Sequence, residues 1–354
     1  MNQCVDIAER PARLVGALVP STRVAPVYLI PLLAATERAG IASDALFHGL
    51  GLVAADLDVP GFVLSPTEAN TVVRRALRLL DVPDLGLTLG MHTRITERGA
   101  LALGMLGAAT LGESIELTLQ FPGSAGYLLA VHAEQDERLH LVIAEPMLGN
   151  DDIAPFLVDI MFAGAVRLRR QVTGKHYAPT TVELTRPRPL NAAAYEQHFA
   201  CPVYFGRSRN VLASAVSWLD HPLPQANAMA YPLSHQLLVS EFERAAAPSP
   251  LGLAVERAIR RALPRALAPA DLARSLNLGE RSLRRKLAQE GLSFRALLDM
   301  AHKARALELM AGTGRSLTEI AMLTGFSDVR AFSRAFKRWT GRPPSALQAA
   351  VQPQ

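Results

Sequence analysis

Six basic side chains near the C-terminus recur at spacings that could turn them toward one partner. They are Arg281, Arg284 and Arg285 in one predicted helix and Arg330, Arg334 and Lys337 in another. Residues three, four and seven positions apart share a face of an α-helix, so each group forms a row of cations. Guanidinium groups donate paired hydrogen bonds to phosphates and to guanine, which is the chemistry of nucleic-acid recognition. A helix with a solvated basic side is the simpler alternative.

The helix predicted from about residue 329 has an apolar side opposite its cations. Phe332, Phe336 and Trp339 lie at positions i, i+4 and i+7, so they share one face. A shorter helix precedes it, and Gly325 stands where a left-handed residue commonly ends a helix. Phe326 can then fold back onto the shorter helix. A short helix, a glycine turn and a cationic second helix are typical of a helix-turn-helix that enters a DNA major groove.

A related pattern lies upstream. A turn at residues 277–279 separates two short helices, and Leu283 and Leu287 form the core face of the second one. A longer helix over residues 294–310 joins the two patterns and spans roughly 25 Å at 1.5 Å per residue. Successive major-groove faces are ~34 Å apart, so the sequence predicts two motifs that enter two adjacent major grooves. The predicted core residues of the two motifs are Leu272, Ala273, Leu283, Leu287, Ile320, Ala321, Gly325, Phe326, Phe332, Phe336 and Trp339.

The basic charge is confined to the last third of the chain. Residues 250–354 carry 18 Lys and Arg against 8 Asp and Glu, a net charge of +10. The whole chain of 354 residues has a net charge of +5, so the preceding part carries −5. This asymmetry indicates that only the C-terminal part meets a polyanion.

The order of helices and strands predicts two domains. In residues 1–244, apolar runs at 127–133 and 138–145 predict a hairpin, and four or five strands alternate with several helices. Residues 245–250 are small, uncharged and Pro-bearing, which is typical of a linker. Residues 251–354 have the pattern of an all-helical domain. The expected fold is therefore an α+β domain followed by an all-α domain with two helix-turn-helix motifs joined by a long helix.

Other kinds of functional site find little support in the sequence. Cys4 and Cys201 form no metal-ligand cluster, and the histidines show no paired spacing. Ser124 follows Pro122, where a nucleophile elbow requires glycine. We therefore expect no catalytic site, no metal and no cofactor. Arg186 and Arg188 could bind an acidic effector, although arginines flanked by prolines usually face water.

The N-terminal region predicts the compartment. Two acids, Asp6 and Glu9, occur within the first ten residues and no apolar segment follows, so we expect no secretory signal. The longest apolar run, residues 24–35, contains two prolines and is too short to span a bilayer. The expected location is the cytoplasm, with no membrane partner.

Three stretches of the C-terminal part carry a specific pattern. They are Gly325-Phe326-Ser327-Asp328, Phe332-Ser333-Arg334-Ala335-Phe336-Lys337-Arg338 and Gly341-x-Pro343-Pro344. With Asp271-Leu272-Ala273 and the run over residues 281–287, they make residues 251–347 resemble the AraC/XylS family of bacterial transcription regulators. In that family the second helix of each motif lies in a major groove. The resemblance implies DNA contacts at Arg281, Arg284, Arg285, Arg330, Ser333 and Arg334.

Two further residues qualify this resemblance. Lys337, further along its helix, is expected to reach the DNA backbone. Gly279 departs from the family, which often has Ser or Thr there, and should cap its helix less firmly by a few tenths of a kcal/mol.

The N-terminal part also resembles a known domain. Asp84-Leu85-Gly86-Leu87, Thr110-Leu111-Gly112-Glu113-Ser114 and Cys201-Pro202-Val203-x-Phe205 are similar to the arabinose-binding-type sensor of a subset of AraC-like proteins, which includes regulators of ornithine use. The resemblance implies that residues 1–244 bind a small effector, dimerise, or do both. It also implies RNA polymerase as a partner and the activator class, whereas the residues leave activation and repression open. The alternative function is an enzyme or modification domain fused to a DNA-binding tail.

Overall fold

The structure is a computed structural model, and it divides into two compact units. The N-terminal unit comprises Met1–Leu46 and Val53–Ala246, and the C-terminal unit comprises Phe47–Leu52 and Ala247–Gln354. Residues 246–249, most of the predicted linker, lie outside the described residues. The structure describes residues 13–16, 23–59, 61–147, 149–174, 177–245, 250–265, 267–289, 292–311, 315–340 and 343–345.

A six-stranded mixed sheet organises the N-terminal unit, with strand order β1-β2-β3-β6-β4-β5. Its strands are β1 (Arg13–Gly16), β2 (Ala130–Gln135), β3 (Leu139–Glu145), β4 (Thr181–Leu184), β5 (Val203–Phe205) and β6 (Asn210–Ala215). The predicted hairpin is confirmed, since β2 and β3 pair antiparallel with Ala133 opposite Val142. Strand β4 lies between β6 and β5 and pairs with β5 in parallel.

The sequence analysis predicted four or five strands, whereas the sheet has six, because the edge strand β1 was not predicted. This strand has only the four residues Arg-Leu-Val-Gly, which are too few to show an alternating pattern. It pairs antiparallel with β2, and its register shifts between Leu14 and Gly16.

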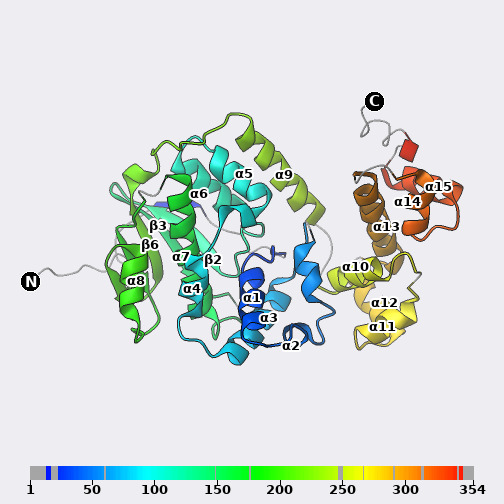
Figure 1. Ribbon diagram of the computed structural model, residues 1–354, viewed down its shortest axis with the longest axis horizontal. Coiled ribbons are helices and arrows are strands. Elements are labelled where there is room, and N and C mark those ends of the chain that lie inside the picture. The colour runs from blue at the N-terminus through cyan, green and yellow to red at the C-terminus, as the bar shows by residue number, and fades with distance from the viewer. Residues whose placement is uncertain are drawn as a thin grey trace, which may run out of the picture. The chain divides into compact units, whose positions relative to one another are not determined.

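Helices α4 (Leu85–Met91) and α7 (Ala154–Val172) lie side by side over the sheet (Figure 1). Two glycines let their backbones approach closely. A Cβ at Gly86 would lie 2.5 Å from the carbonyl oxygen of Phe156, and one at Gly90 would lie 2.6 Å from the Cβ of Ala163. The Asp84-Leu85-Gly86-Leu87 stretch therefore has a packing reason for its glycine.

Helices α5 (Ala100–Gly107) and α9 (Ala230–Ala245) form a second close pair in this unit. A Cβ at Gly104 would lie 2.5 Å from Ser234 Oγ, and one at Gly107 would lie 2.8 Å from the Cβ of Ala230. Ser234 Oγ donates a 2.7 Å hydrogen bond to the carbonyl oxygen of Ala100. These contacts join the wall of the N-terminal core to α9, the helix that leads toward the C-terminal unit in the chain.

The remaining helices surround this core. Helix α3 begins with a capping box, because Ser65 Oγ accepts a 3.2 Å hydrogen bond from Glu68 N and Glu68 Oε2 accepts a 2.9 Å bond from Ser65 N. These helices are α1 (Leu29–Arg38), α2 (Asp44–Phe47), η2 (Ala54–Asp58), α3 (Pro66–Leu80), η3 (Ile95–Arg98), α6 (Leu111–Gln120), α8 (Ala192–Phe199) and η4 (Val216–Trp218).

The C-terminal unit is helical throughout its described residues from Pro250 onward. Helix α13 has 18 residues and is therefore roughly 27 Å long. No helix in the described part of the chain is long and apolar enough to cross a bilayer. The helices are α10 (Pro250–Ala262), α11 (Pro269–Ser275), α12 (Glu280–Gln289), α13 (Phe294–Ala311), α14 (Leu317–Leu323) and α15 (Val329–Thr340).

A buried polar cluster lies between α7 and the sheet. His140 on β3 is 3% exposed and stands opposite Ser214 on β6. Arg169 Nη1 donates a 2.6 Å hydrogen bond to the Tyr177 hydroxyl, which lies 2.6 Å from Ser214 Oγ. Burial and, to a lesser extent, the charge of Arg169 together lower the pKa of the His140 imidazole to about 4.

This histidine should make stability depend on pH. The folded protein keeps His140 neutral, whereas the unfolded chain takes up a proton near pH 6.5. The stability is present above pH 6.5 and is lost as the pH falls from 6.5 to about 4, by up to roughly 3 kcal/mol. We expect His140→Gln to flatten this dependence, measured by urea unfolding with Trp218 fluorescence in a Trp339→Phe background.

The matched control is Val142→Ala on the same strand, which should lower the free energy of unfolding equally at every pH. If His140→Gln also changed the free energy of unfolding by the same amount at every pH, the titration of His140 would not be the cause of the pH dependence.

Candidate nucleic-acid interface

Two helix pairs of the C-terminal unit turn in the same way. After α11, Asn277 adopts a left-handed φ of 54°, and after α14, Gly325 adopts a φ of 83°. The next amide then bonds back to the fifth residue before it. Leu278 N donates to the carbonyl oxygen of Ala273 at 2.8 Å, and Phe326 N donates to that of Ala321 at 2.9 Å. Glycine and asparagine are the residues that tolerate this backbone conformation best.

The first pair, α11 and α12, is held by aliphatic side chains. Leu272, Ala273, Leu283 and Leu287 are all at most 1% exposed, and they pack with residues of α10 and α13. Because the two leucines of α12 are four positions apart, they fix which side of that helix faces inward.

The second pair, α14 and α15, is held by aromatic side chains. Ile320, Ala321, Phe332 and Phe336 are buried, whereas the predicted core residues Phe326 and Trp339 are half-buried against them. The Phe326 ring lies 5.7 Å from the rings of both Phe332 and Trp339. Sequence analysis missed a further member of this cluster. His302 on α13 packs edge-on against Phe326, and burial lowers the pKa of its imidazole.

Gly325 was predicted as a core residue and lies instead at an exposed position in the turn. Its importance is conformational, because its φ of 83° excludes most side chains. A Cβ there would also lie 2.9 Å from the carbonyl oxygen of Pro264.

The two second helices differ in how they begin. Asp328 Oδ1 accepts a 2.7 Å hydrogen bond from Ala331 N, and this bond lowers the pKa of the Asp328 carboxyl. At the start of α12 stands Gly279, which has no side chain to accept such a bond. The α14 helix has a full capping box, since Ser316 Oγ and Glu319 Oε2 each accept the other residue's amide.

The predicted DNA contacts lie on the outer sides of α12 and α15. Arg284 Nη2 lies 2.6 Å from Glu280 Oε1 one turn earlier, and Arg334 lowers the pKa of Asp328 through its charge. Within the described part of the chain, Arg281, Arg285, Arg330 and Lys337 form no ion pair. Ser333 is half-buried, and the exposed cations are Arg281, Arg284, Arg285, Arg330, Arg334 and Lys337.

Arg338 differs from these cations. Its Nη2 lies 2.9 Å from Asp299 Oδ1, so its guanidinium ties α15 to α13. This contact gives Arg338 a structural role and makes it a natural control for the neighbouring cations.

In the N-terminal unit, the expectation that Arg186 faces water was wrong. Its guanidinium pairs with Asp84 Oδ1 at 3.1 Å and with Asp159 Oδ2, and Nη1 donates to the Tyr195 hydroxyl at 2.6 Å. Burial raises the pKa of Asp159 to about 6, against the opposing charge of Arg186. Asp159 is an acid within the otherwise apolar face of α7, and this feature of the sequence could have indicated a buried ion pair. Arg188 does face water, with its side chain 63% exposed.

The families and proteins that this chain resembles are transcription regulators or domains of them. Family models match at residues 40–223, for the arabinose-binding domain of AraC transcription regulator, and at residues 272–350, for a helix-turn-helix domain. The ornithine utilization regulator of Pseudomonas aeruginosa is 28% identical over 350 residues, covering 97% of this chain and 99% of that protein. The regulator VirS of Mycobacterium tuberculosis is 27% identical over 282 residues, covering 76% and 80%. The solved structure of the regulator CdpR of Pseudomonas aeruginosa covers 91% of this chain and 98% of that one, with 21% identity and a TM-score of 0.43.

The turn geometry leads to a test at two glycines. We expect Gly325→Ser to destabilise the C-terminal unit by about 1–2 kcal/mol, because it forces a side chain into a left-handed backbone. Gly279→Ser should stabilise it by a few tenths of a kcal/mol, because the new hydroxyl can cap α12 and meets no atom within 4 Å. Urea unfolding followed by Trp339 fluorescence in a Trp218→Phe background measures both changes, and effects of equal sign would contradict the assignment.

Proposed function

The chain belongs to the AraC family of transcription regulators, and on that premise we propose how its parts divide the work. It is a DNA-binding regulator with an N-terminal ligand-binding domain, and it is not an enzyme. We assign effector binding and dimerisation to residues 1–244, the linker to residues 245–250 and DNA binding to residues 251–354. The alternative of an enzyme fused to a DNA-binding tail has no support, because the match over residues 40–223 is to a regulator's domain.

We propose that α11–α12 and α14–α15 are two helix-turn-helix motifs and that α13 is the spacer between them. The repeated turn carries this proposal. The bond from Leu278 N to Ala273 O and the bond from Phe326 N to Ala321 O close the same loop in both pairs. With a spacer roughly 27 Å long, α12 and α15 could enter adjacent major grooves on one side of the duplex.

The outer sides of α12 and α15 are the proposed DNA-reading surfaces. Arg285 and Arg334 are exposed, so each can turn two donors to a guanine. Lys337 lies further along α15 and is suited to a phosphate. The remaining proposed contacts are Arg281, Arg284, Arg330 and Ser333.

Effector binding can change regulation only if the effector favours one arrangement of the DNA-binding units over another. We propose that the N-terminal unit supplies this preference and that the regulator, with RNA polymerase as its partner, acts as an activator in the bacterial cytoplasm, where the chromosome lies. The relative named for ornithine utilization makes amino acids one class of effector to test against others.

The two-groove arrangement is tested with single substitutions and a randomised-operator selection. We expect Arg285→Ala and Arg334→Ala to relax specificity at different base pairs, about ten apart, each by about 1–3 kcal/mol of discrimination. Lys337→Ala should weaken all sequences alike and lower the salt slope by about one unit.

Arg338→Ala is the control, because its guanidinium is bound to Asp299 and not offered to DNA. Loss of preference at one shared base pair, or at none, would rule out two separate reading helices.

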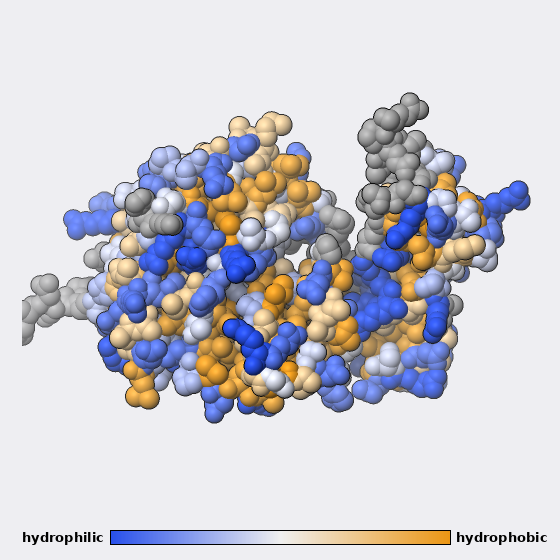
Figure 2. Space-filling model, in the orientation of Figure 1, coloured by the Kyte–Doolittle hydropathy of each residue, from blue (hydrophilic) through white to orange (hydrophobic). Residues whose placement is uncertain are grey.

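We propose that two copies pair through an apolar stripe on α9. Leu233 and Leu237 lie four positions apart on α9 and are 49% and 41% exposed, and Met229, directly before the helix, is 82% exposed. One side of this helix is therefore unusually apolar. Figure 2 shows apolar surface over α5 and α9. A stripe on one helix can pair with the same stripe of a second copy in a two-fold contact, and the two tethered DNA-binding units then gain effective concentration.

Leu233→Glu should break this pairing, because two carboxylates would be brought into one apolar contact. We expect the dimer dissociation constant from analytical ultracentrifugation to rise about tenfold or more. Leu190→Glu is the control, since Leu190 is fully exposed and lies away from α9 in the chain. An unchanged constant for Leu233→Glu, or a monomeric wild type, would refute this interface.

A further inference from the structure

A buried arginine in the N-terminal unit pairs with no carboxylate among the residues that the structure describes. Arg98, at the end of η3, is 7% exposed, and its Nη1 donates a 3.0 Å hydrogen bond to the carbonyl oxygen of Ala125. Its Nε has no hydrogen-bond partner. The guanidinium also stands over the Tyr28 ring, 5.7 Å from the ring centroid. Among the described residues, no carboxylate forms an ion pair with Arg98.

A guanidinium removed from water is costly unless an anion and hydrogen-bond acceptors replace the solvent. One carbonyl oxygen, one aromatic face and a hydrogen bond to the Tyr28 hydroxyl, all of them neutral groups, replace only part of it. Arg74 shows the missing arrangement in the same unit. Its Nε and Nη2 donate to the two carboxylate oxygens of Asp152 at 2.5 and 2.7 Å. In Arg98 the corresponding Nε donates no hydrogen bond to any described residue.

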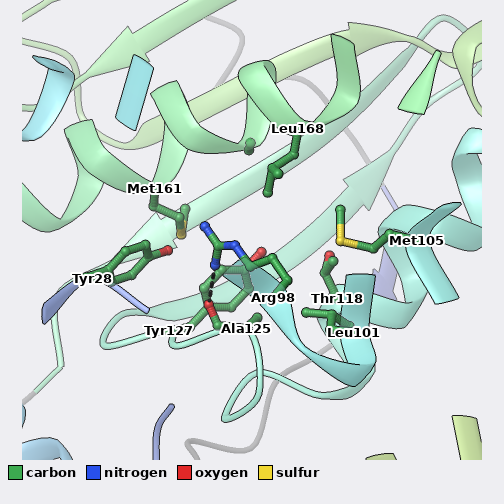
Figure 3. A pocket seen from close by; sticks show the side chains of 10 residues that line it. Tyr28, Arg98, Leu101, Met105, Thr118, Ala125, Tyr127, Met161 and Leu168 are labelled. Atoms are coloured by element: carbon green, nitrogen blue, oxygen red, sulfur yellow. Dashed lines mark hydrogen bonds between the residues drawn. The ribbon is translucent and has the colours of Figure 1, made fainter. Parts of the chain in front are cut away.

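The guanidinium of Arg98 faces a small cavity of about 20 Å³ (Figure 3). Most of its wall is apolar, from Leu101 and Met105 on one side and Met161 and Leu168 on the other. The neutral polar groups are the hydroxyls of Tyr28, Tyr127 and Thr118, and no Asp or Glu lines the cavity.

The two phenol hydroxyls, of Tyr28 and Tyr127, can complement an anion. The Thr118 hydroxyl donates its one proton to the carbonyl oxygen of Ile115 at 2.7 Å, so it has none to offer a ligand. Burial raises the pKa of the Tyr28 phenol above its ordinary value, which keeps the proton that a ligand oxygen could accept.

We propose that this cavity is the effector site and that Arg98 binds the carboxylate of a ligand with an apolar body. This inference rests on the proposed effector control of the N-terminal unit and names the chemical class of that effector. The ligand carboxylate would take the free edge of Arg98, and its apolar body would lie among the leucines and methionines. An α-amino acid fits poorly, because its ammonium group would lie beside Arg98 with no carboxylate to pair with.

The cavity is so small that its wall must move if a ligand is to enter. About 20 Å³ is little more than the space that one ordered water needs. Met105 and Met161 are unbranched and have three rotatable side-chain bonds, so they are the parts of the wall best able to make room. Met105 lies on α5, which packs against α9, and ligand binding would therefore be felt at the helix leading to the linker.

The experiment uses the full chain, with hexanoate as the probe, and isothermal titration calorimetry as the measurement. Hexanamide lacks the charge, and norleucine adds only an α-ammonium group to hexanoate. We expect hexanoate to bind and the two analogues to bind about tenfold more weakly or not at all. Equal affinity for hexanoate and hexanamide, or no binding of hexanoate, would overturn the proposal. Tighter binding of norleucine would overturn its exclusion of amino acids.

Two variants locate the site. Arg98→Gln should weaken hexanoate binding about tenfold or more, whereas Arg94→Gln, at the exposed start of the same short helix, should leave it unchanged. Should Arg98→Gln fail to fold, methyl NMR of the wild type with ¹³C-labelled methionine decides the question. Hexanoate must shift the Met105 and Met161 signals and leave that of the exposed Met229 in place, and the reverse pattern would refute the site.

DNA binding is measured on the same preparations with a random-sequence duplex at several salt concentrations. If DNA binding fails while hexanoate binds at Arg98, the DNA-binding assignment is wrong and the carboxylate site stands. If DNA binding is intact and hexanoate does not bind, the carboxylate site alone is wrong.

Discussion

The burial of a few side chains on α12 and α15 decides where the cations of the C-terminal unit point. A helix presents its side chains at fixed angles around its axis. Because Phe332 and Phe336 face the core, Arg330 and Arg334 lie on the side of α15 that faces solvent. Burying each of these phenylalanines stabilises the fold by about 1.5–3 kcal/mol, whereas the arginines lose nothing by staying in water. Leu283 and Leu287 impose the same constraint on α12. The proposed DNA surface therefore follows from the core and needs no separate force to orient it.

This dependence explains why the C-terminal unit was the easier part to predict. Helix period, turn residues and caps are local signals, and Asp328 caps α15 by accepting a hydrogen bond from the amide of Ala331 three residues later. The N-terminal unit depends on contacts between distant segments. Arg186 meets Asp84 and Asp159 only because α4, α7 and the end of β4 converge, and a proline-flanked arginine gives no hint of that. The burial of Arg98 away from any carboxylate of the described residues was equally hidden, because it depends on the fold and leaves no pattern in the sequence.

Glycines let pairs of helices in the N-terminal unit pack closely on either side of the cavity beside Arg98, whose wall includes flexible methionine side chains. Gly86 and Gly90 press α4 onto α7, and Gly104 and Gly107 press α5 onto α9. At such distances a helix cannot shift without displacing its neighbour. The cavity beside Arg98 is walled by Met105 of α5 and Met161 of α7, so flexible side chains stand between two rigid pairs. On the proposal made above, a ligand that displaces Met105 would act on α5, which packs against α9.

The energies set the scale of the control that such a site can exert. Moving an equilibrium from 1:99 to 99:1 takes about 5.5 kcal/mol of differential binding. A hydrogen bond to a charged group contributes about 1.5–3 kcal/mol, so one carboxylate on the free edge of Arg98 supplies only part of that shift. Burial of the ligand's apolar body adds to it, at roughly 25 cal/mol per Å² removed from water. If two copies pair through α9 as proposed, the two effector sites act on one equilibrium and their contributions combine. The proposed pairing would therefore reduce the differential binding that each bound ligand must supply to switch the regulator.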